Sequence, residues 1–157
     1  MYLVTVVLLL LVLPTVSVIL ELLLGPRGML VVVLIGKWYV FWAIGVRLLL
    51  AGIRQVSGPR FTAAEIFHLD NVRAFPIVRE IGFANLAMGT LGICTIFRPM
   101  WLIPAALVGG LYYGLAGAGH LLREERNVKE YIAMFSDGFA FLVLLGIVVC
   151  GLTAQRR

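Results

Sequence analysis

The sequence has few charged residues and little cysteine. Asp, Glu, Lys and Arg make up 13% of its 157 residues, whereas a soluble domain has about 25%. Together with 62% hydrophobic residues, this excludes a disordered chain and exceeds what one soluble core can bury. The net charge of +5 does not indicate a nucleic-acid partner, because the basic residues lie between apolar blocks. We therefore predict a polytopic membrane protein with no nucleic-acid partner.

Motifs for metal binding, redox chemistry and catalysis are also missing. Cys94 and Cys150 lie in separate apolar runs, which predicts two small, buried free thiols. The sequence holds no CxxC, HExxH or GxSxG pattern and no carboxylate pair at a workable spacing. It therefore favours a protein that is not an enzyme and indicates no metal site.

What the chain does have is a series of apolar runs near the length needed to cross a bilayer, about 20 residues. Lipid leaves only helices and closed barrels as spanning structures, and the alternation typical of barrel strands is absent. We therefore predict an all-α transmembrane helix bundle that forms one domain over residues 1–157. Five spans are expected, with four as the alternative. The expected spans are residues 2–24, 29–53, 81–97, 100–122 and 131–152.

The first run has the features of a retained transmembrane helix. No basic residue precedes Arg27, and no small-residue cleavage site follows the run, which argues against a signal peptide. Pro14 is expected to kink this helix, because proline removes one backbone hydrogen bond. A turn is predicted at residues 25–28, where glycine and proline interrupt the apolar pattern.

The longest polar connection covers residues 54–80. Thr62 and Glu65 have the spacing of a capping box, which predicts a short amphipathic helix over residues 63–69 at the membrane surface or under the bundle. Pro76 is expected to stop regular structure before the third span.

The distribution of basic residues predicts the orientation. With five spans, the N-terminus and the connections 54–80 and 123–130 share one side, which holds seven Lys and Arg residues against four on the other. The positive-inside rule then places the N-terminus in the cytoplasm and the C-terminus outside an inner, cytoplasmic membrane. The connection 123–130 mixes both signs and is predicted to be a solvated helical turn that pairs with the basic loop 54–80.

Ionisable residues at membrane depth are costly and usually face the protein interior or a water-filled cavity. At a rise of about 1.5 Å per residue, five polar residues from four spans share the cytoplasmic half of the bilayer. We predict that they form a binding site in which an arginine pairs with an aspartate. They are Arg47, Glu80, Asn85, His120 and Asp137. A structural ion pair that fixes the helix register and a proton relay remain alternatives.

Other residues are assigned to structure. Glu21 and Lys37 flank the first turn on the opposite side and are predicted to form a structural ion pair. Aromatic residues of the second span are expected to pack inside the bundle, or alternatively to stack on a flat ligand such as a quinone headgroup. They are Trp38, Tyr39, Phe41 and Trp42.

Glycines recur at three- and four-residue spacing on the third and fourth spans. Small residues in such stripes favour close helix contacts, either within the chain or with a partner helix. The residues expected to make these contacts are Gly89, Gly92, Gly110 and Gly117.

Three segments carry a resemblance to a known family. They are FWAIGVRLLLAGIRQVSGPRFTAAEIF (41–67), VREIGFANLAMGTLGI (78–93) and GGLYYGLAGAGHLLREERNVKEYIAMFSD (109–137). They resemble a family of small bacterial and archaeal integral membrane proteins of unknown function, over roughly residues 38–145. The residues matched to that family are Arg47, Gln55, Arg79, Glu80, Asn85, His120 and Asp137. A looser similarity is to DoxX-like four-helix membrane proteins, some of which are linked to quinone-dependent redox enzymes.

Two functions remain open from the sequence. One is a module that binds a small polar or amphipathic molecule, such as a lipid, quinone or metabolite, or aids its transport. The other is an accessory subunit that packs its glycine faces against a larger membrane complex or a second copy of itself. Neither requires a bound cofactor, although a quinone or a lipid could serve, and membrane lipids are expected partners of both.

Overall fold

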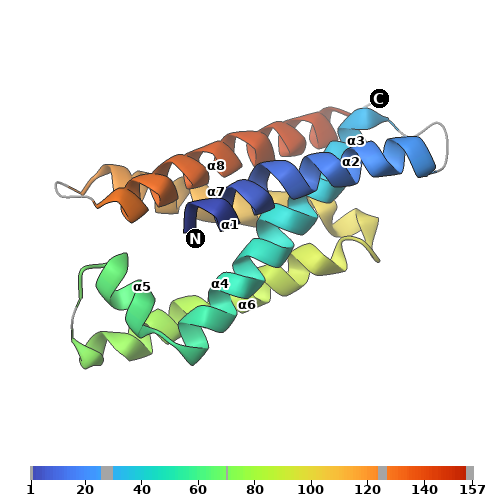
Figure 1. Ribbon diagram of the computed structural model, residues 1–157. Helices are drawn as coiled ribbons and strands as arrows, with labels where there is room; N and C mark the ends of the chain where they lie inside the picture. Colours follow the sequence, from blue (N-terminus) through green and yellow to red (C-terminus); the bar gives the residue numbers. More distant parts are fainter. Residues whose placement is uncertain (1, 26–29, 70, 124–126, 155–157) are drawn as a thin grey trace.

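The computed structural model describes residues 2–25, 30–69, 71–123 and 127–154. In this part of the chain all regular structure is helical, and five helices are long and apolar enough to span a membrane (Figure 1). The predicted all-α membrane bundle is therefore confirmed. The five helices cover Tyr2–Leu24, Val31–Ser57, Val72–Cys94, Pro99–Leu121 and Val128–Thr153. Residues 26–28 of the turn expected at 25–28 and the charges of residues 124–126 lie outside the described residues.

The first span changes its winding around Pro14. It consists of α1 (Tyr2–Val7), a π-helical stretch η1 (Leu8–Val12) and α2 (Leu13–Leu24), and Pro14 lies in the first turn of α2. Proline has no backbone N–H to give to the preceding turn, and a π-helical turn is one way for a helix to absorb such an interruption. The proline therefore alters the helix without ending the span.

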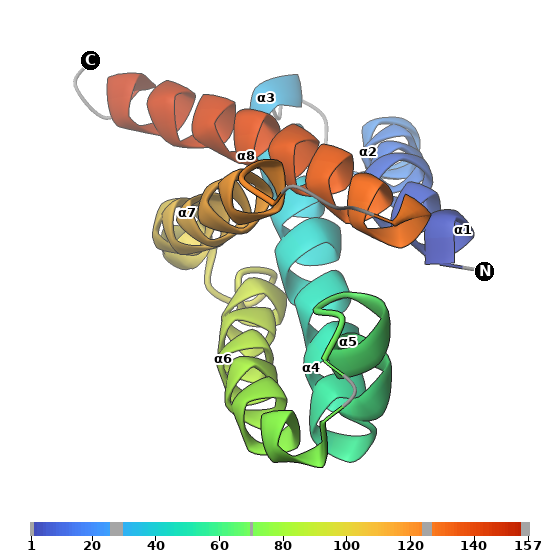
Figure 2. The same cartoon turned by 90° about the vertical axis from the view of Figure 1, so that its left-hand side faces the viewer.

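The second span runs through the centre of the bundle. It consists of α3 (Val31–Tyr39), the π-helical η2 (Val40–Val46) and α4 (Arg47–Ser57). The side chains of η2 form the middle of the apolar core, where Val40, Ala43 and Ile44 are at most 1% exposed. Figure 2 shows this span passing from the α7 and α8 pair to lie beside α6.

The third span begins earlier than expected. A 3-10 turn, η3 (Val72–Ala74), leads into α6 (Phe75–Cys94), so the helix starts at Phe75 rather than at residue 81. Pro76 does not stop regular structure, and that expectation is wrong. It occupies the first turn of α6, where the missing N–H has no partner to lose and the fixed φ favours the helix.

The expected capping box is also wrong. The short helix α5 spans Arg60–Glu65 and begins directly after Pro59, without a side-chain cap. Pro59 already has a helical φ of −64°, so the helix starts upstream of Thr62. Thr62 is a buried residue within α5, and Glu65 ends the helix.

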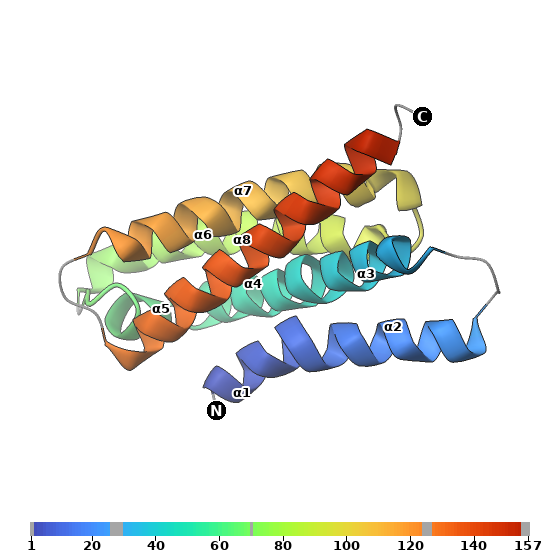
Figure 3. The same cartoon turned by 90° about the horizontal axis from the view of Figure 1, so that it is seen from above.

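The last two spans form an antiparallel pair. A 3-10 turn, η4 (Pro99–Trp101), precedes α7 (Leu102–Leu121), and α8 (Val128–Ala154) packs along it (Figure 3). The expected burial of both thiols is wrong for Cys150, which α8 exposes on the outside of the bundle, while Cys94 is half-buried. Both cysteines are free.

The two helix pairs separate toward one end of the molecule. The pair α4 and α6 diverges from the pair α7 and α8 toward the end that also holds α5 and the N-terminus (Figures 1 and 2). The apolar core lies away from this end, around η2. The fold therefore leaves room between the two pairs on the side where the sequence concentrates basic residues.

Candidate functional site

A cavity of about 930 Å³ lies between the diverging helices. This volume falls within the range of small-molecule sites, about 300–1,000 Å³. Side chains from α1, α4, α5, α6, α7 and α8 line it, and the lining includes four Lys and Arg residues and one carboxylate. The charged lining residues are Arg47, Arg54, Arg123, Lys129 and Asp137.

Arg47 and Asp137 form the predicted ion pair in the wall of this cavity. One terminal nitrogen of Arg47, Nη2, donates to Asp137 Oδ1 at 2.8 Å and to Ser136 Oγ at 2.9 Å. The guanidinium carbon also lies 4.8 Å from the ring centroid of Tyr113, a cation–π contact. The other terminal nitrogen, Nη1, is buried and has no hydrogen-bond partner among the described residues. The guanidinium is thus fixed in place with donor capacity left over.

The residues around Arg47 are themselves anchored to the backbone. Ser136 donates its hydroxyl to the carbonyl of Ala133, and the Tyr113 hydroxyl donates to the carbonyl of Ala43 in η2. Tyr113 is 2% exposed. These hydrogen bonds restrict the positions of Ser136 and Tyr113, and these two residues in turn restrict the position of the Arg47 guanidinium.

Asn85 lies in the same cavity but contacts a different partner. Its amide Nδ2 donates to Gln55 Oε1 at 2.8 Å, and both residues line the cavity. Asn85 is 1% exposed, and its Oδ1 is a buried acceptor without a hydrogen-bond partner among the described residues. The structure therefore adds Gln55 of α4 to the polar wall.

His120 lies beside a buried carboxylate, Glu130. The exposed fraction of Glu130 is 0%, and it accepts a hydrogen bond from Arg123. Its Oε2 is 3.0 Å from His68 Nε2, and its Oε1 is 3.6 Å from His120 Nδ1. The expectation that residues 123–130 form a solvated turn is wrong for Glu130, which is fully buried. Its partners compensate the cost of burying its charge.

Residues of the connection 123–130 also form hydrogen bonds with the end of α5, beside the cavity. Arg123 donates to the carbonyl of Ile66 at 2.8 Å, and Asn127 donates to the carbonyl of Glu65 at 2.8 Å. Lys129 pairs with Glu65, and this hydrogen bond lowers the pKa of the exposed Glu65 carboxyl. The structure thus contains the expected pairing between the two polar connections.

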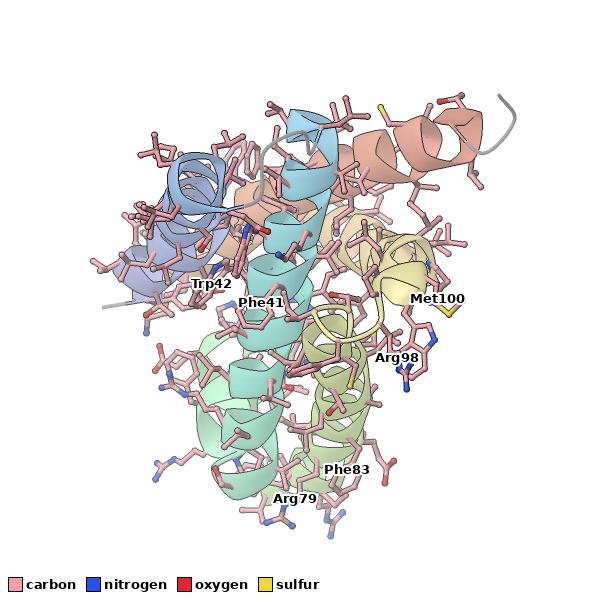
Figure 4. The ribbon with its side chains drawn as sticks, turned by 90° about the vertical axis from the view of Figure 1, so that its right-hand side faces the viewer. Phe41, Trp42, Arg79, Phe83, Arg98 and Met100 are labelled. Carbon is pink, nitrogen blue, oxygen red and sulfur yellow. The ribbon has the colours of Figure 1, made fainter. Side chains whose placement is uncertain are left out.

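Glu80 is not brought into the cavity. It is exposed near the start of α6 and does not line the cavity wall, whereas the other four predicted residues do. Its neighbour Arg79 is also exposed, and Figure 4 shows Arg79 and Phe83 at the outer end of α6. Because α6 starts earlier than expected, residues 79 and 80 belong to a continuous helix surface.

Glu21 and Lys37 pair away from the cavity, between α2 and α3. Lys37 Nζ lies 2.6 Å from Glu21 Oε1, and Trp38 Nε1 donates to Glu21 Oε2. Trp42 Nε1 donates to Ser17 Oγ at 2.9 Å. Figure 4 shows Trp42 and Phe41 beside the first span. The aromatic group of the second span takes part in helix packing, and none of its four members lines the cavity within the described chain.

The glycines of α6 make close contacts with the backbone of the second span. A Cβ added at Gly89 would lie 2.5 Å from the Leu49 backbone nitrogen, and one added at Gly45 would lie 3.1 Å from the Gly92 carbonyl carbon. The contacts predicted for Gly110 and Gly117 of α7 are looser, because a Cβ at either position would meet α8 at 3.4 Å, an ordinary van der Waals distance. The α6 stripe is therefore covered by the second span of the same chain.

Sequence reasoning missed Arg54 and Glu130, although helical spacing held a signal for both. Arg54 lies seven residues after Arg47, and Glu130 lies seven residues before Asp137. Residues seven apart lie on the same face of an α-helix, two turns away. The faces that carry the central pair therefore carry these charged groups as well.

The fold and the cavity define a small polytopic membrane-helix bundle with a basic internal site. Residues 4–155 match the model of a family of unknown function, DUF6790, and the chain belongs to this family. Neither a curated protein nor a solved structure matches the chain. These comparisons do not support the looser similarity to DoxX-like proteins.

Proposed function

We propose that this protein binds an anionic amphipathic molecule in its cavity. The negative head would contact Arg47 and Arg54, and the apolar part would lie against the surrounding aliphatic and aromatic side chains. One observation carries the proposal. Arg47 is held in the cavity wall by its ion pair and by Tyr113, and Arg54 lines the same cavity with no acidic partner in the described part of the chain.

The charge balance of the cavity favours an anion. Arg47 is paired with Asp137, Arg123 with Glu130, and Lys129 with Glu65. The guanidinium carbon of Arg54 lies 3.8 Å from the ring centroid of Phe61, and Arg54 has no acidic partner in the described part of the chain. Guanidinium groups suit carboxylates and phosphates, because their N–H donors match two oxygens at once.

The position of Arg54 supports a shared role with Arg47. The two residues are seven positions apart on α4, hence about 10.5 Å apart along the helix, and both line the cavity. Gln55 and Asn85 add amide groups to the same wall. An anion between the two guanidiniums could accept hydrogen bonds from both sides.

The remaining lining favours an amphipathic molecule over a free ion. Apolar and aromatic groups from several helices complete the walls, and a small inorganic anion would leave them without contacts. The lining includes Tyr2, Leu9, Leu48, Ile66, Phe67 and Ile81. A neutral quinone headgroup would use this lining but would not neutralise Arg54, so we favour the anion.

We further propose that the basic end of the molecule faces the cytoplasm of a prokaryotic cell. This proposal rests on the positive-inside rule applied to the connections at that end. The cavity would then open to the cytoplasmic side, where soluble anionic metabolites and lipid headgroups are both available.

An accessory subunit is the second candidate. That function requires glycine faces open to a partner helix, but the α6 glycines pack on Gly45, Leu49 and Gly52 within the chain. We therefore place ligand binding first.

The test is a binding measurement on the protein purified in a mild nonionic detergent. Dodecyl phosphate is compared with dodecanol, inorganic phosphate and dodecyltrimethylammonium, using thermal unfolding and native mass spectrometry. Dodecyl phosphate should raise Tm, since ligand at about 100 times its Kd adds about 2.7 kcal/mol. The other three compounds should produce smaller shifts or none.

Two matched variants separate site binding from general charge effects. Arg54→Gln should remove most of the shift, while Arg79→Gln should keep it, because Arg79 is exposed and lies outside the cavity. An equal shift with dodecanol, or an undiminished shift in Arg54→Gln, would show that the cavity does not select an anion. An equal shift with inorganic phosphate would show that the apolar part of the ligand is irrelevant.

A further inference from the structure

A second hollow lies on the outside of the bundle between the first span and α8. This groove has a volume of about 390 Å³ and is almost entirely apolar. Leu3 and Val7 line it from α1, and Phe135 and Phe139 line it from α8. Leu3 and Phe135 are 52% and 70% exposed, so the groove faces the surroundings of the bundle, which in a membrane are lipid chains.

The groove and the cavity adjoin at Val6, which lines both hollows. Ser136 lines the groove, and its hydroxyl accepts a hydrogen bond from Arg47 Nη2 at 2.9 Å. The apolar groove therefore lies next to a hydroxyl that binds the Arg47 guanidinium.

We propose that this groove holds the far end of the apolar chain of the same anionic amphiphile, whose first carbons lie against the cavity lining, and is its lateral entry from the bilayer. The inference rests on the proposed function and adds the ligand class: a single-chain anion, such as a fatty acid or a monoalkyl phosphate. The groove lies between the first span and α8 alone, which suits one chain. A head at Arg47 and a chain between α1 and α8 would each lie in the surroundings that match their polarity.

The choice of occupant follows from charge and continuity. A partner helix in the groove would cover its apolar lining but would supply no anion to Arg54, which has no acidic partner among the described residues. A neutral lipid chain would also supply no anion to Arg54. A single-chain anion satisfies both the apolar groove and the basic cavity.

The test is photolabelling with a dodecyl phosphate that carries a diazirine at the end of its chain. The full-length protein is reconstituted in nanodiscs of a zwitterionic lipid, and the labelled residues are mapped by mass spectrometry. Labelling that unlabelled dodecyl phosphate suppresses should fall on residues 3–11 and 128–139. Dodecanol should not suppress it.

A variant that fills the groove gives an independent measurement. Val7→Trp should lower the suppressible labelling about tenfold, equivalent to about 1.4 kcal/mol. Leu20→Trp is the matched control, because Leu20 is an exposed apolar residue of α2 that does not line the groove. The labelling map of the unsubstituted protein stands even if Val7→Trp does not fold.

The outcomes distinguish this inference from the proposed function. Suppressible labelling confined to cavity residues such as Leu48 and Ile81, or unchanged labelling in Val7→Trp, would overturn the groove as the chain site and leave the cavity proposal intact. Labelling that dodecyl phosphate does not suppress, together with no Tm shift, would overturn both. Suppression by dodecanol would show that the groove takes any single chain and that Arg47 does not select the ligand.

Discussion

Gly89 of α6 lies against Leu49 of α4 so closely that a Cβ at position 89 would be 2.5 Å from the Leu49 backbone nitrogen. A change of side-chain rotamer could not relieve that overlap, because the neighbouring atom belongs to the backbone of another helix. Close backbone approach of this kind is what small residues permit in membrane helix pairs. The close approach of α4 and α6 therefore requires that position 89 has no side chain.

Alanine substitutions at three glycines should separate tight contacts from loose ones. Gly89→Ala should lower the free energy of unfolding by about 1–3 kcal/mol, the usual cost of overpacking. Gly117→Ala should cost less, because its nearest atom is at 3.4 Å, and Gly146→Ala should have little effect, with nothing within 4 Å. Thermal unfolding in mild detergent measures the series, and equal stability of all three variants would contradict the described packing.

The Arg47–Asp137 pair should show strong coupling in a double-mutant cycle. Arg47→Leu leaves a carboxylate without its partner and should destabilise the protein by about 3–5 kcal/mol. Adding Asp137→Leu should restore much of that stability, because no buried charge is then left unpaired. The two single variants and the double variant are compared by thermal unfolding. Additive effects would show that the two residues do not depend on each other.

Glu130 should contribute more to stability than its sequence context indicates. Glu130→Gln weakens the contacts with Arg123 and His68 inside a fully buried position, so we expect a loss of about 1–3 kcal/mol. The control is Glu65→Gln, which removes an exposed ion pair with Lys129 and should change Tm little. If both variants unfold at the same temperature, the buried carboxylate has no special role.

Cysteine accessibility should reveal the orientation in the membrane. Ser57 and Phe97 lie near opposite ends of the bundle, and both are exposed. After Cys94 and Cys150 are replaced by alanine, Ser57→Cys and Phe97→Cys can each be treated with a membrane-impermeant maleimide on intact cells. We expect labelling of Phe97→Cys only, since the positive-inside rule places Ser57 in the cytoplasm. The reverse pattern would invert the proposed orientation.

The spans were predictable because lipid imposes a strong requirement on length and polarity. Apolar runs located five helices, and the cost of unpaired charge in lipid pointed to a pair between Arg47 and Asp137. Boundaries at Pro59 and Pro76 were harder, because proline both ends helices and starts them, and only its position in the turn decides which.

The rest of the site depended on side-chain partners that sequence spacing alone does not reveal. Glu130 follows a charged segment and was expected in solvent, but it is buried against His68, which follows α5, and against the end of α7. Glu80 was expected in the site from depth alone, and depth does not specify the helix face. The seven-residue spacing does predict that Arg54 shares a helix face with Arg47, and Glu130 with Asp137, but it does not predict their partners.

The cavity has a closed inner end, and this limits how a molecule could leave it. Its deepest lining residues on α4 and α8 are Arg47 and Asp137, and the described residues beyond them, such as Val40, Ala43 and Leu144, are 0% exposed. A molecule held at Arg47 would therefore have to return to the aqueous side it came from or leave sideways between α1 and α8. Exchange between water and one leaflet needs no rearrangement of the core, whereas passage to the opposite leaflet would require the helices around η2 to separate.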